Sequence, residues 1–364
     1  MRAGWAAAAV LVLVAGGCGG SDDPAAEPSA TPSSPASSTP PASNSQTPEP
    51  PESSAPPASE LDWQPVPGTV RNTVTRSSEW TLTVRGNGAG WSLDGPTGST
   101  GGEQSGWRVS DALLDQDWAV VVLQERTESQ PSRAEVTELA TGDTFTVDGS
   151  SDVPTTNGGT WALGDGRLLH ATIGPGGSYC VAAVELATRE SSLGWCAPKR
   201  HGFNGARIAP GGDSVLSFDA GRPSCRTLVA LDGTEAVPFE GVAECVAWDG
   251  LRTGDGAVWS TIPDERRIEE AHFFATAAGE RVDLGPGTAG SLVWCAGAAY
   301  FTRDPELDGD PATLVRWSPT DGPDVVYESP GGRAFLSQPR CGGDHLTITA
   351  AAEAGDEQVT AALS

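Results

Sequence analysis

The strongest local signal for chemistry is the acidic segment Asp304-Pro-Glu-Leu-Asp-Gly-Asp310. Hard cations need several oxygen ligands that converge from a sharply turning loop, and the glycine in this segment permits such a turn. The segment is therefore a candidate Ca²⁺ site, and no other cofactor is expected. The four candidate ligands are its acidic residues, Asp304, Glu306, Asp308 and Asp310. The alternative is a solvated acidic loop in an acidic protein.

Other patterns that carry chemistry are weak or missing in the sequence. The histidines show no His-x-x-x-His or Glu-x-x-His spacing, no serine nucleophile elbow is present, and the Gly-rich turns open no helix that could hold phosphate. His170 sits in a Leu-Leu-His-Ala-Thr run, which predicts a hydrogen-bonded residue of a sheet. The single basic cluster is a candidate contact for an anion, and it consists of Lys199, Arg200 and His201.

An apolar segment opens the chain and ends at a cysteine. Met1 and Arg2 form a positively charged start, residues 3–14 are apolar, and small residues directly precede Cys18. These are the three parts of a secretory signal peptide. The apolar run is too short to remain as a transmembrane helix. We therefore predict a signal peptide over residues 1–17.

The position of Cys18 resembles the lipobox of bacterial lipoproteins, although Ala15 stands where leucine is commoner. The resemblance implies a diacylglyceryl thioether on Cys18 and an anchor in the outer leaflet of the cell membrane. The alternative is an ordinary secretory signal with a chance cysteine. After Cys18 the chain is rich in Ser, Pro, Thr and Ala, without aromatic or large aliphatic residues, so residues 18–60 are expected to be a lipidated, disordered tether.

The remainder, residues 61–364, is expected to form one large all-β domain. Short alternating or apolar runs recur between turns rich in Gly, Asp and Pro, which indicates strands, and no sustained helical periodicity is present. The chain carries 48 acidic residues against 22 Lys and Arg, a net charge of −26. A surface this acidic disfavours nucleic acid, and none is expected as a partner.

Two short elements recur in this domain with a period of roughly 42 to 49 residues. One is a strand that ends near a leucine before a polar turn, as in Val136-Thr-Glu-Leu-Ala-Thr-Gly and Val229-Ala-Leu-Asp-Gly-Thr. The other is a tight turn that leads into an apolar strand, as in Gln116-Asp-Trp-Ala-Val-Val-Val and Gly164-Asp-Gly-Arg-Leu-Leu. Seven copies of each element can be aligned.

A period in the forties with several short strands per copy is typical of β-propeller blades. The domain resembles seven-bladed β-propellers of the broad class that includes quinoprotein-like, TolB-like and WD40-like domains, although it lacks the Gly-His and Trp-Asp signature. The last copy ends at Ser364 after its third strand. The segment Leu61–Val66 can supply the missing outer strand, so we expect an N-terminal strand to close the last blade. Six blades is the alternative.

Six cysteines remain when Cys18 is set aside, and an even number in an exported protein implies disulfides. In the blade register, one pair faces across the third and fourth strands of blade 3, and another holds nearly the same places in blade 4. The third pair ends the innermost strands of blades 6 and 7. The predicted bonds are Cys180–Cys196, Cys225–Cys245 and Cys295–Cys341.

Loop length indicates which face of the propeller could bind a partner. The long, varied connections emerge on one common face: residues 125–133, 148–159, 199–204, 263–270 and 303–311. Variable loops on a rigid scaffold often carry function. We expect a ligand-binding or protein-interaction scaffold without catalysis, outside the cytoplasm, with a protein or glycan partner at this loop-rich face. The alternative is a glycan hydrolase or lyase that uses carboxylates at the channel mouth.

Substitution of Cys18 by serine is expected to remove the anchor, because serine has no thiol to form the thioether. Fractionation of cells that express Cys18→Ser should find the protein in the medium or as an unprocessed precursor, whereas the wild type stays with the membrane. A variant that fractionates with membranes and is cleaved at the same site contradicts the lipoprotein prediction.

Overall fold

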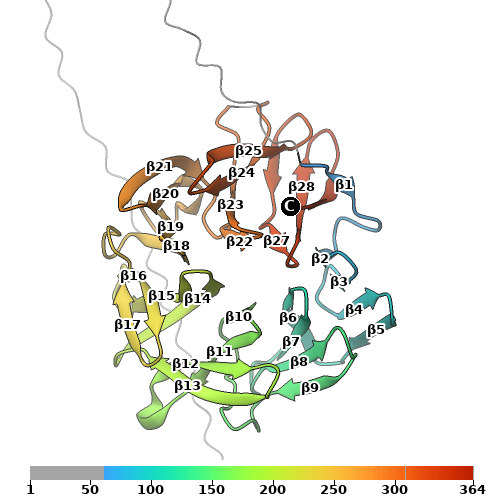
Figure 1. Cartoon of the computed structure of the whole chain (residues 1–364), viewed down its shortest axis with the longest axis vertical. Helices are drawn as coiled ribbons and strands as arrows, with labels where there is room; N and C mark the ends of the chain where they lie inside the picture. The colour runs from blue at the N-terminus through green and yellow to red at the C-terminus, as the bar shows by residue number, and fades with distance from the viewer. Residues whose placement is uncertain (1–60, 308, 364) are drawn as a thin grey trace, which may run out of the picture. The chain divides into compact units, whose positions relative to one another are not determined.

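The computed structural model describes residues 61–307 and 309–363, which form seven antiparallel sheets arranged in a ring (Figure 1). The ring is a seven-bladed β-propeller, so the predicted fold class is confirmed and the six-bladed alternative is wrong. The predicted signal peptide (1–17), Cys18 and the tether (18–60) lie outside the described residues. Within them, neither short 3-10 helix, η1 (Pro175–Gly177) or η2 (Ile268–Glu270), has the length or the apolar run needed to cross a membrane.

Each of the first six blades is a four-stranded meander. Blade 1 contains β2 (Thr73–Arg76), β3 (Thr81–Val84), β4 (Gly90–Gly95) and β5 (Gly98–Glu103). Blade 2 contains β6 (Trp107–Leu114), β7 (Trp118–Glu125), β8 (Arg133–Glu138) and β9 (Thr144–Val147). Blade 3 contains β10 (Trp161–Gly164), β11 (Arg167–Ile173), β12 (Tyr179–Glu185) and β13 (Glu190–Cys196). Blade 4 contains β14 (His201–Ala209), β15 (Gly212–Asp219), β16 (Arg226–Asp232) and β17 (Glu235–Pro238). Blade 5 contains β18 (Ala247–Thr253), β19 (Gly256–Thr261), β20 (Ala271–Ala277) and β21 (Glu280–Gly287). Blade 6 contains β22 (Val293–Cys295), β23 (Ala298–Arg303), β24 (Thr313–Ser318) and β25 (Gly322–Glu328).

Blade 7 is built from both ends of the described chain. It contains β26 (Ala334–Leu336), β27 (Arg340–Cys341), β28 (His345–Ala352), β29 (Glu357–Ala362) and β1 (Gln64–Pro65). Its inner edge is split, since β26 and β27 both pair with β28. Its outer edge is β1, which pairs with β29. The predicted closure by an N-terminal strand is therefore confirmed.

Burial changes systematically from strand to strand within a blade. In β7, with the sequence Trp-Ala-Val-Val-Val-Leu-Gln-Glu, every residue except the last is buried, as expected for a strand covered on both faces. Its β-branched residues suit such a strand. The outermost β5 is rich in glycine and small polar residues and is almost wholly exposed. Polar outer strands and apolar second strands thus turn each repeat into a blade that must pack between neighbours.

Six apolar clusters hold consecutive blades together. Each cluster lies between two adjacent blades, from the pair 1–2 through to the pair 6–7, and the cluster of blades 5 and 6 also includes Ala209 of blade 4. Tryptophans on or directly before the second strands contribute to three of them: Trp80 between blades 1 and 2, Trp118 between 2 and 3, and Trp259 between 4 and 5. Burial of apolar area between blades is therefore the main force that joins six of the seven junctions.

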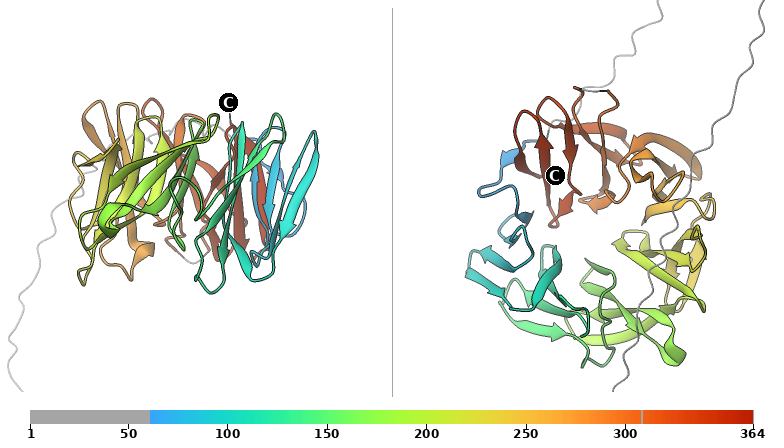
Figure 2. Two further views of the ribbon diagram at one scale, coloured as in Figure 1. Left: turned by 90° about the horizontal axis from the view of Figure 1, so that it is seen from below. Right: turned by 180° about the vertical axis from the view of Figure 1, so that it is seen from behind.

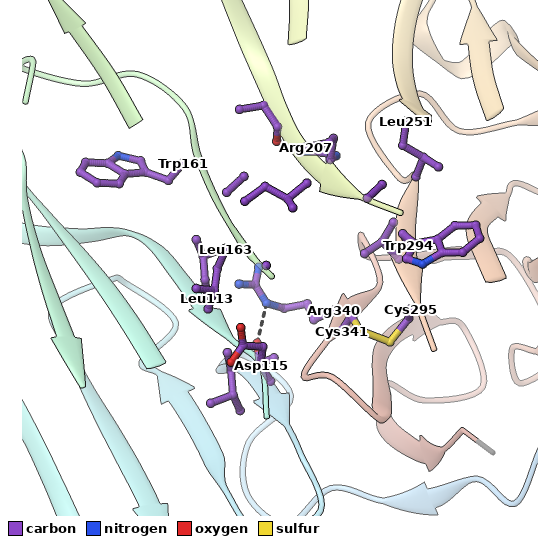
Figure 3. A pocket seen from close by; sticks show the side chains of 18 of the residues that line it. Leu113, Asp115, Trp161, Leu163, Arg207, Leu251, Trp294, Cys295, Arg340 and Cys341 are labelled. Atoms are coloured by element: carbon purple, nitrogen blue, oxygen red, sulfur yellow. Dashed lines mark hydrogen bonds between the residues drawn. A yellow bond between two sulfur atoms is a disulfide. The ribbon is translucent and has the colours of Figure 1, made fainter. Parts of the chain in front are cut away.

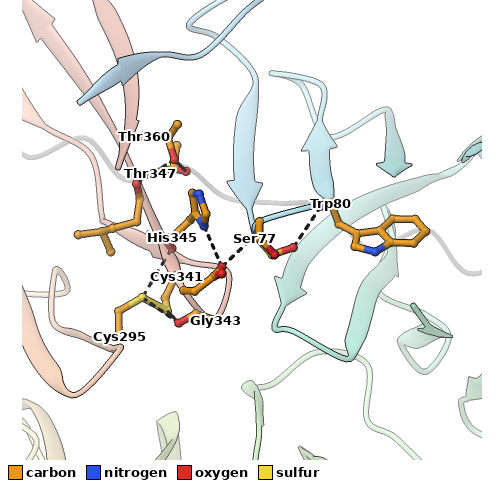
Figure 4. A network of polar contacts seen from close by, with 11 residues as sticks. Ser77, Trp80, Cys295, Cys341, Gly343, His345, Thr347 and Thr360 are labelled. Carbon is orange, nitrogen blue, oxygen red and sulfur yellow. Dashed lines mark hydrogen bonds and ion pairs between the residues drawn. A yellow bond between two sulfur atoms is a disulfide. The ribbon is translucent and has the colours of Figure 1, made fainter. Parts of the chain in front are cut away.

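The junction of blade 7 with blade 1 is polar instead, since none of the six clusters of the described chain spans it (Figure 4). The Asp344 carboxylate accepts the backbone N–H of Ser78 at 3.1 Å and lies 2.8 Å from Nδ1 of His345. Gly342 allows the close approach, because a Cβ there would lie 1.9 Å from the carbonyl oxygen of Arg76. Directional bonds and backbone proximity thus define this junction.

The N-terminal segment adds apolar contacts to the closure. Trp63 packs into the cluster between blades 6 and 7, its ring 5.2 Å from that of Tyr327, and its Nε1 donates to the Val326 carbonyl at 2.7 Å. The Val66 N–H donates to the Gln358 carbonyl at 2.8 Å. The segment before blade 1 therefore binds blades 6 and 7 together.

The three disulfides join the predicted pairs. Cys180–Cys196 lies within blade 3, and Cys225–Cys245 flanks the outer hairpin of blade 4. Cys295–Cys341 connects blade 6 to blade 7 across 46 residues of sequence. In the chain-entropy account, a longer closed loop constrains the unfolded chain more strongly, so this bond should stabilise most.

A chain that begins at residue 72 is expected to unfold at a clearly lower temperature than one that begins at residue 58. The shorter chain lacks β1 and Trp63, which leaves β29 unpaired and removes the apolar contact with blade 6. Thermal melts followed by circular dichroism measure the difference. Equal midpoints would show that β1 does not close the ring, and a chain that begins at 61 serves as the control for loss of the tether.

Candidate functional site

A cavity of about 490 Å³ occupies the centre of the ring (Figure 3). All seven blades line it, because each contributes residues of its innermost strand or of the turn that follows. These strands are β2, β6, β10, β14, β18, β22 and β27. The volume falls in the range of small-molecule sites, and a concave site lined by converging elements is where binding is expected. The cavity is therefore the candidate functional site.

The lining belongs to the end of the channel where the tight turns lie. Asp115 and Asp165 come from the turns after β6 and β10, and Pro210 and Ala296 hold similar places in blades 4 and 6. The long connections emerge at the opposite face of the ring (Figure 2). Loop length did not indicate this cavity, because inner strands and short turns form most of its wall. The expected partner at the loop-rich face stays a prediction.

Arg340 extends from β27 to the inner strands of two other blades. Its Nε donates to Oγ1 of Thr75 on β2 at 2.8 Å, and its Nη2 donates to the carbonyl of Ala112 on β6. These bonds hold the guanidinium at the channel wall, while 24% of the side chain stays exposed to the cavity (Figure 3). The gap between β26 and β27, which contains Pro339, separates Arg340 from the regular part of the inner edge.

Asp111 on β6 is the carboxylate closest to Arg340. Its Oδ1 lies 4.0 Å from Nη2 of Arg340 and accepts the N–H of Ala112 at 2.8 Å. Burial raises the pKa of Asp111, and the charges of Arg340 and Arg207 oppose that shift without cancelling it. The ion pair is therefore loose, and the carboxylate is disfavoured as an anion.

Arg207 on β14 is the second guanidinium of the cavity. Its Nη1 donates to the Ala206 carbonyl at 3.1 Å. Its positive charge opposes the effect of burial, which raises the pKa of both Asp111 and Asp249. Asp249 on β18 is only 8% exposed. Its Oδ2 accepts the N–H of Gly290 at 2.5 Å, and burial, the largest cause, raises its pKa overall. Arg207 is thus electrostatically coupled to carboxylates of blades 2 and 5.

These four residues form what we call the channel charge layer, and they are Asp111, Arg207, Asp249 and Arg340, from blades 2, 4, 5 and 7. Guanidinium groups keep their proton in proteins, whereas the carboxylates of the layer are disfavoured as anions by burial. The arrangement can therefore do two things chemically. It can bind an anion, and it can offer a protonated carboxyl group at a raised pKa.

The mouth of the cavity is acidic. Burial raises the pKa of Asp115, and the negative charges of Asp117 and Asp165 add to the shift. The backbone N–H groups of Asp117 and Trp118 donate to Asp115 at 2.9 and 2.7 Å and oppose it. A ligand that approaches from this end meets negative potential before it reaches the arginines.

The predicted anion contact lies elsewhere. Lys199, Arg200 and His201 are exposed on the loop-rich face, the first two in the connection between β13 and β14 and His201 as the first residue of β14. His201 places its Nδ1 3.2 Å from the Lys199 carbonyl. None of the three lines the cavity.

The predicted calcium loop connects β23 to β24, also on the loop-rich face. Asp308 lies outside the described residues, so the predicted ligand set is described only in part. The Oδ2 of Asp310 accepts the backbone N–H of Leu307 at 3.2 Å. Among residues 61–307 and 309–363, no three side chains of His, Cys, Asp or Glu are grouped to hold a metal. The described part of the loop does not assemble a site.

His170 is a sheet residue, as predicted. It is buried on β11, with Nδ1 3.0 Å from the Ala171 carbonyl and the ring stacked on Trp161 at 5.4 Å. Burial lowers its pKa, so the imidazole is neutral.

The sequence reasoning did not find the channel charge layer. Arginines in the repeat give no usable signal, because the innermost strands of blades 1, 2 and 5 also carry one each: Arg76, Arg108 and Arg252. A charged residue in such a strand must be paired or functional, since burial of an unpaired charge is costly.

No family model and no curated protein matches the sequence. Among solved structures, the chain is similar to the β-propeller domain of the Trilobed protease from Pyrococcus furiosus, with a TM-score of 0.55 and 10% identity over 80% of this chain and 94% of that one. It is similar to a prolyl endopeptidase with a TM-score of 0.52 and 11% identity, covering 79% of this chain but 45% of that one. For TolB from Acinetobacter baumannii the TM-score is 0.40, with 9% identity over 80% and 78% of the two chains. At such identities the likeness to the first two structures shows the fold alone.

Substitution of Asp249 by asparagine is expected to stabilise the protein at pH 8. Because the pKa of Asp249 is raised, the contribution of this residue to stability is fully present below the ordinary Asp pKa of about 3.9 and is lost as the pH rises through the raised value. Asparagine carries no charge to bury and keeps an oxygen for the Gly290 N–H. Thermal midpoints should therefore favour Asp249→Asn at pH 8 and converge with the wild type at pH 4.

Asp283→Asn is the matched control with the opposite sign. Hydrogen bonds from His272 and from the N–H of Gly285 lower the pKa of Asp283, so its contribution is present at neutral pH and is lost on acidification. The control should be less stable than the wild type at pH 7. If Asp249→Asn is instead destabilised at every pH, attraction between Asp249 and Arg207 outweighs burial.

Proposed function

We propose that the chain is an exported, lipid-anchored propeller that binds a small ligand in its central channel and does not itself catalyse a reaction. The observation that carries this proposal is the cavity of about 490 Å³ that all seven blades line. Its wall combines half-buried apolar side chains with two arginines, a composition typical of sites that bury an apolar body and orient it by a few charges.

The location outside the cytoplasm is supported by the three disulfides, since such bonds persist in oxidising compartments. The diacylglyceryl anchor on Cys18 adds attachment to the outer leaflet of the membrane. The long tether predicted over residues 18–60 would let the propeller reach a ligand away from the lipid surface. A protein or glycan that docks on the loop-rich face is a further part of the proposal.

A second candidate is an enzyme that cleaves glycans at the channel. The observation that favours it is the raised pKa of Asp111, which lines the cavity, because a carboxyl group that stays protonated can act as a general acid. Turnover of cell-wall or acidic glycans by the full-length protein, lost in Asp111→Asn, would establish this activity in place of simple binding.

A tryptophan in place of Leu163 is expected to block the channel. Leu163 is half-buried on β10 and lines the cavity, so a larger side chain fills space that a ligand would occupy. A thermal-shift screen of small metabolites should find compounds that raise the midpoint of the wild type and not of Leu163→Trp. Leu193→Trp is the control, since Leu193 is 38% exposed on the outer strand β13 of the same blade. Compounds that act equally on all three proteins contradict binding in the channel.

A further inference from the structure

The two arginines of the channel charge layer come from blades that lie across the ring from each other. Arg207 belongs to β14 of blade 4 and Arg340 to β27 of blade 7, and both line the cavity. Among the described residues that line it, they are the sole basic side chains. A small molecule in the cavity therefore has cationic groups on two of its sides.

Both guanidinium groups keep donors that the protein does not use. Within residues 61–307 and 309–363, the Arg207 side chain makes one hydrogen bond, from Nη1 to the Ala206 carbonyl. Arg340 uses Nε and Nη2, and its Nη1 has no partner in the same part of the chain. An arginine has five N–H donors in a planar fork, so several remain for a ligand.

The internal counter-ions do not saturate these arginines. Asp111 lies 4.0 Å from Arg340, beyond hydrogen-bond distance. The Oδ2 of Asp249 accepts hydrogen bonds from the N–H of Gly290 and the hydroxyl of Ser260. Among the carboxylates of the cavity wall, Asp111 is the one within salt-bridge distance of Arg340, and Asp115 and Asp165 come from the turns at the mouth. The unused guanidinium donors can therefore bind one small anionic group.

We propose that the channel binds a small monocarboxylic acid with an apolar body, whose carboxylate is held by Arg207 and Arg340. This inference rests on the proposed function and names the ligand class of the same site. A carboxylate is planar and offers two acceptor oxygens, which match the guanidinium fork.

The rest of the wall selects the body of this ligand. Leu113, Leu163, Ile208 and Trp294, from blades 2, 3, 4 and 6, are half-buried and line the cavity. An apolar body that covers them gains roughly 25 cal/mol for each Å² of apolar surface removed from water. The volume of about 490 Å³ suits one small molecule rather than a peptide chain.

The acidic mouth sets an upper limit on ligand charge. Asp115 and Asp165 lie between the arginines and the tight-turn end, and the whole chain carries a net charge of −26. A polyanion such as a nucleotide or a polyphosphate meets strong repulsion at this mouth. A monocarboxylate carries one charge and meets the least repulsion among anions.

Calorimetry with the full-length protein and three probes tests the proposal. 3-Phenylpropionate supplies one carboxylate and an apolar body, 3-phenylpropanol keeps the body without the charge, and inorganic phosphate supplies charge without the body. We expect 3-phenylpropionate to bind at least about tenfold more tightly than either of the other two, the difference that one charge-assisted hydrogen bond makes. Equal binding of the alcohol, or no binding of the acid at millimolar concentration, overturns the proposal.

Variants locate the contact. Arg207→Gln should weaken binding of 3-phenylpropionate about tenfold or more and leave the fold intact, because its described hydrogen bond is to the neighbouring Ala206 carbonyl. Arg340→Gln should weaken it as well, although loss of the bonds to Thr75 and Ala112 also lowers stability. Arg108→Gln is the matched control, since Arg108 lies on the inner strand β6 outside the cavity lining and binds Gln124. An unchanged affinity of Arg207→Gln for 3-phenylpropionate would contradict the proposal that Arg207 binds the carboxylate.

Failure of this inference can be told from failure of the proposed function. If other compounds bind and Leu163→Trp abolishes their binding while 3-phenylpropionate does not bind, the channel is a binding site for a different ligand class. If no compound distinguishes the wild type from Leu163→Trp, both the site and its assignment are wrong.

Discussion

Closure of the ring at blade 7 is the constraint on which the rest of the molecule depends. Six junctions between blades are joined by buried apolar clusters, and the junction of blades 7 and 1 relies on polar contacts and a glycine that lets two backbones meet. The pairing of β1 with β29 and the packing of Trp63 supply what this junction lacks. Because β1 and β29, from the two ends of the described residues, meet in one sheet, the ring cannot open there without loss of main-chain hydrogen bonds.

The closure and the candidate site share a residue, and this couples architecture to function. Arg340 starts in blade 7, bonds Thr75 of blade 1 and reaches the Ala112 carbonyl of blade 2, so it crosses the polar junction and enters the cavity. Desolvation of an arginine and of nearby carboxylates costs free energy that well-packed apolar residues would avoid. The channel charge layer is therefore poorly explained by stability alone, and the ligand binding that we propose would account for it.

The sequence predicted those parts that repeat or that are close in the chain. Seven blades, the closing strand and the disulfides follow from the period, because equivalent positions in successive copies occupy equivalent places in the ring. The charged residues of the loops at 199–204 and 303–311 led to the predicted anion and Ca²⁺ sites, yet these loops lie on the face away from the cavity. Loop composition reports local chemistry, whereas the wall of the channel is made by inner strands whose residues are single and scattered.

The sequence by itself determined that the chain is all-β, that its blades stack and close with the N-terminal strand, and which cysteines pair. The reason is that alternation, turns and period act locally and fix each blade before the ring forms. Only the tertiary structure decided that Asp111, Arg207, Asp249 and Arg340 form one charge layer. They belong to four different blades, and electrostatic coupling depends on distance through space inside a poorly solvated channel, which spacing along the chain does not encode.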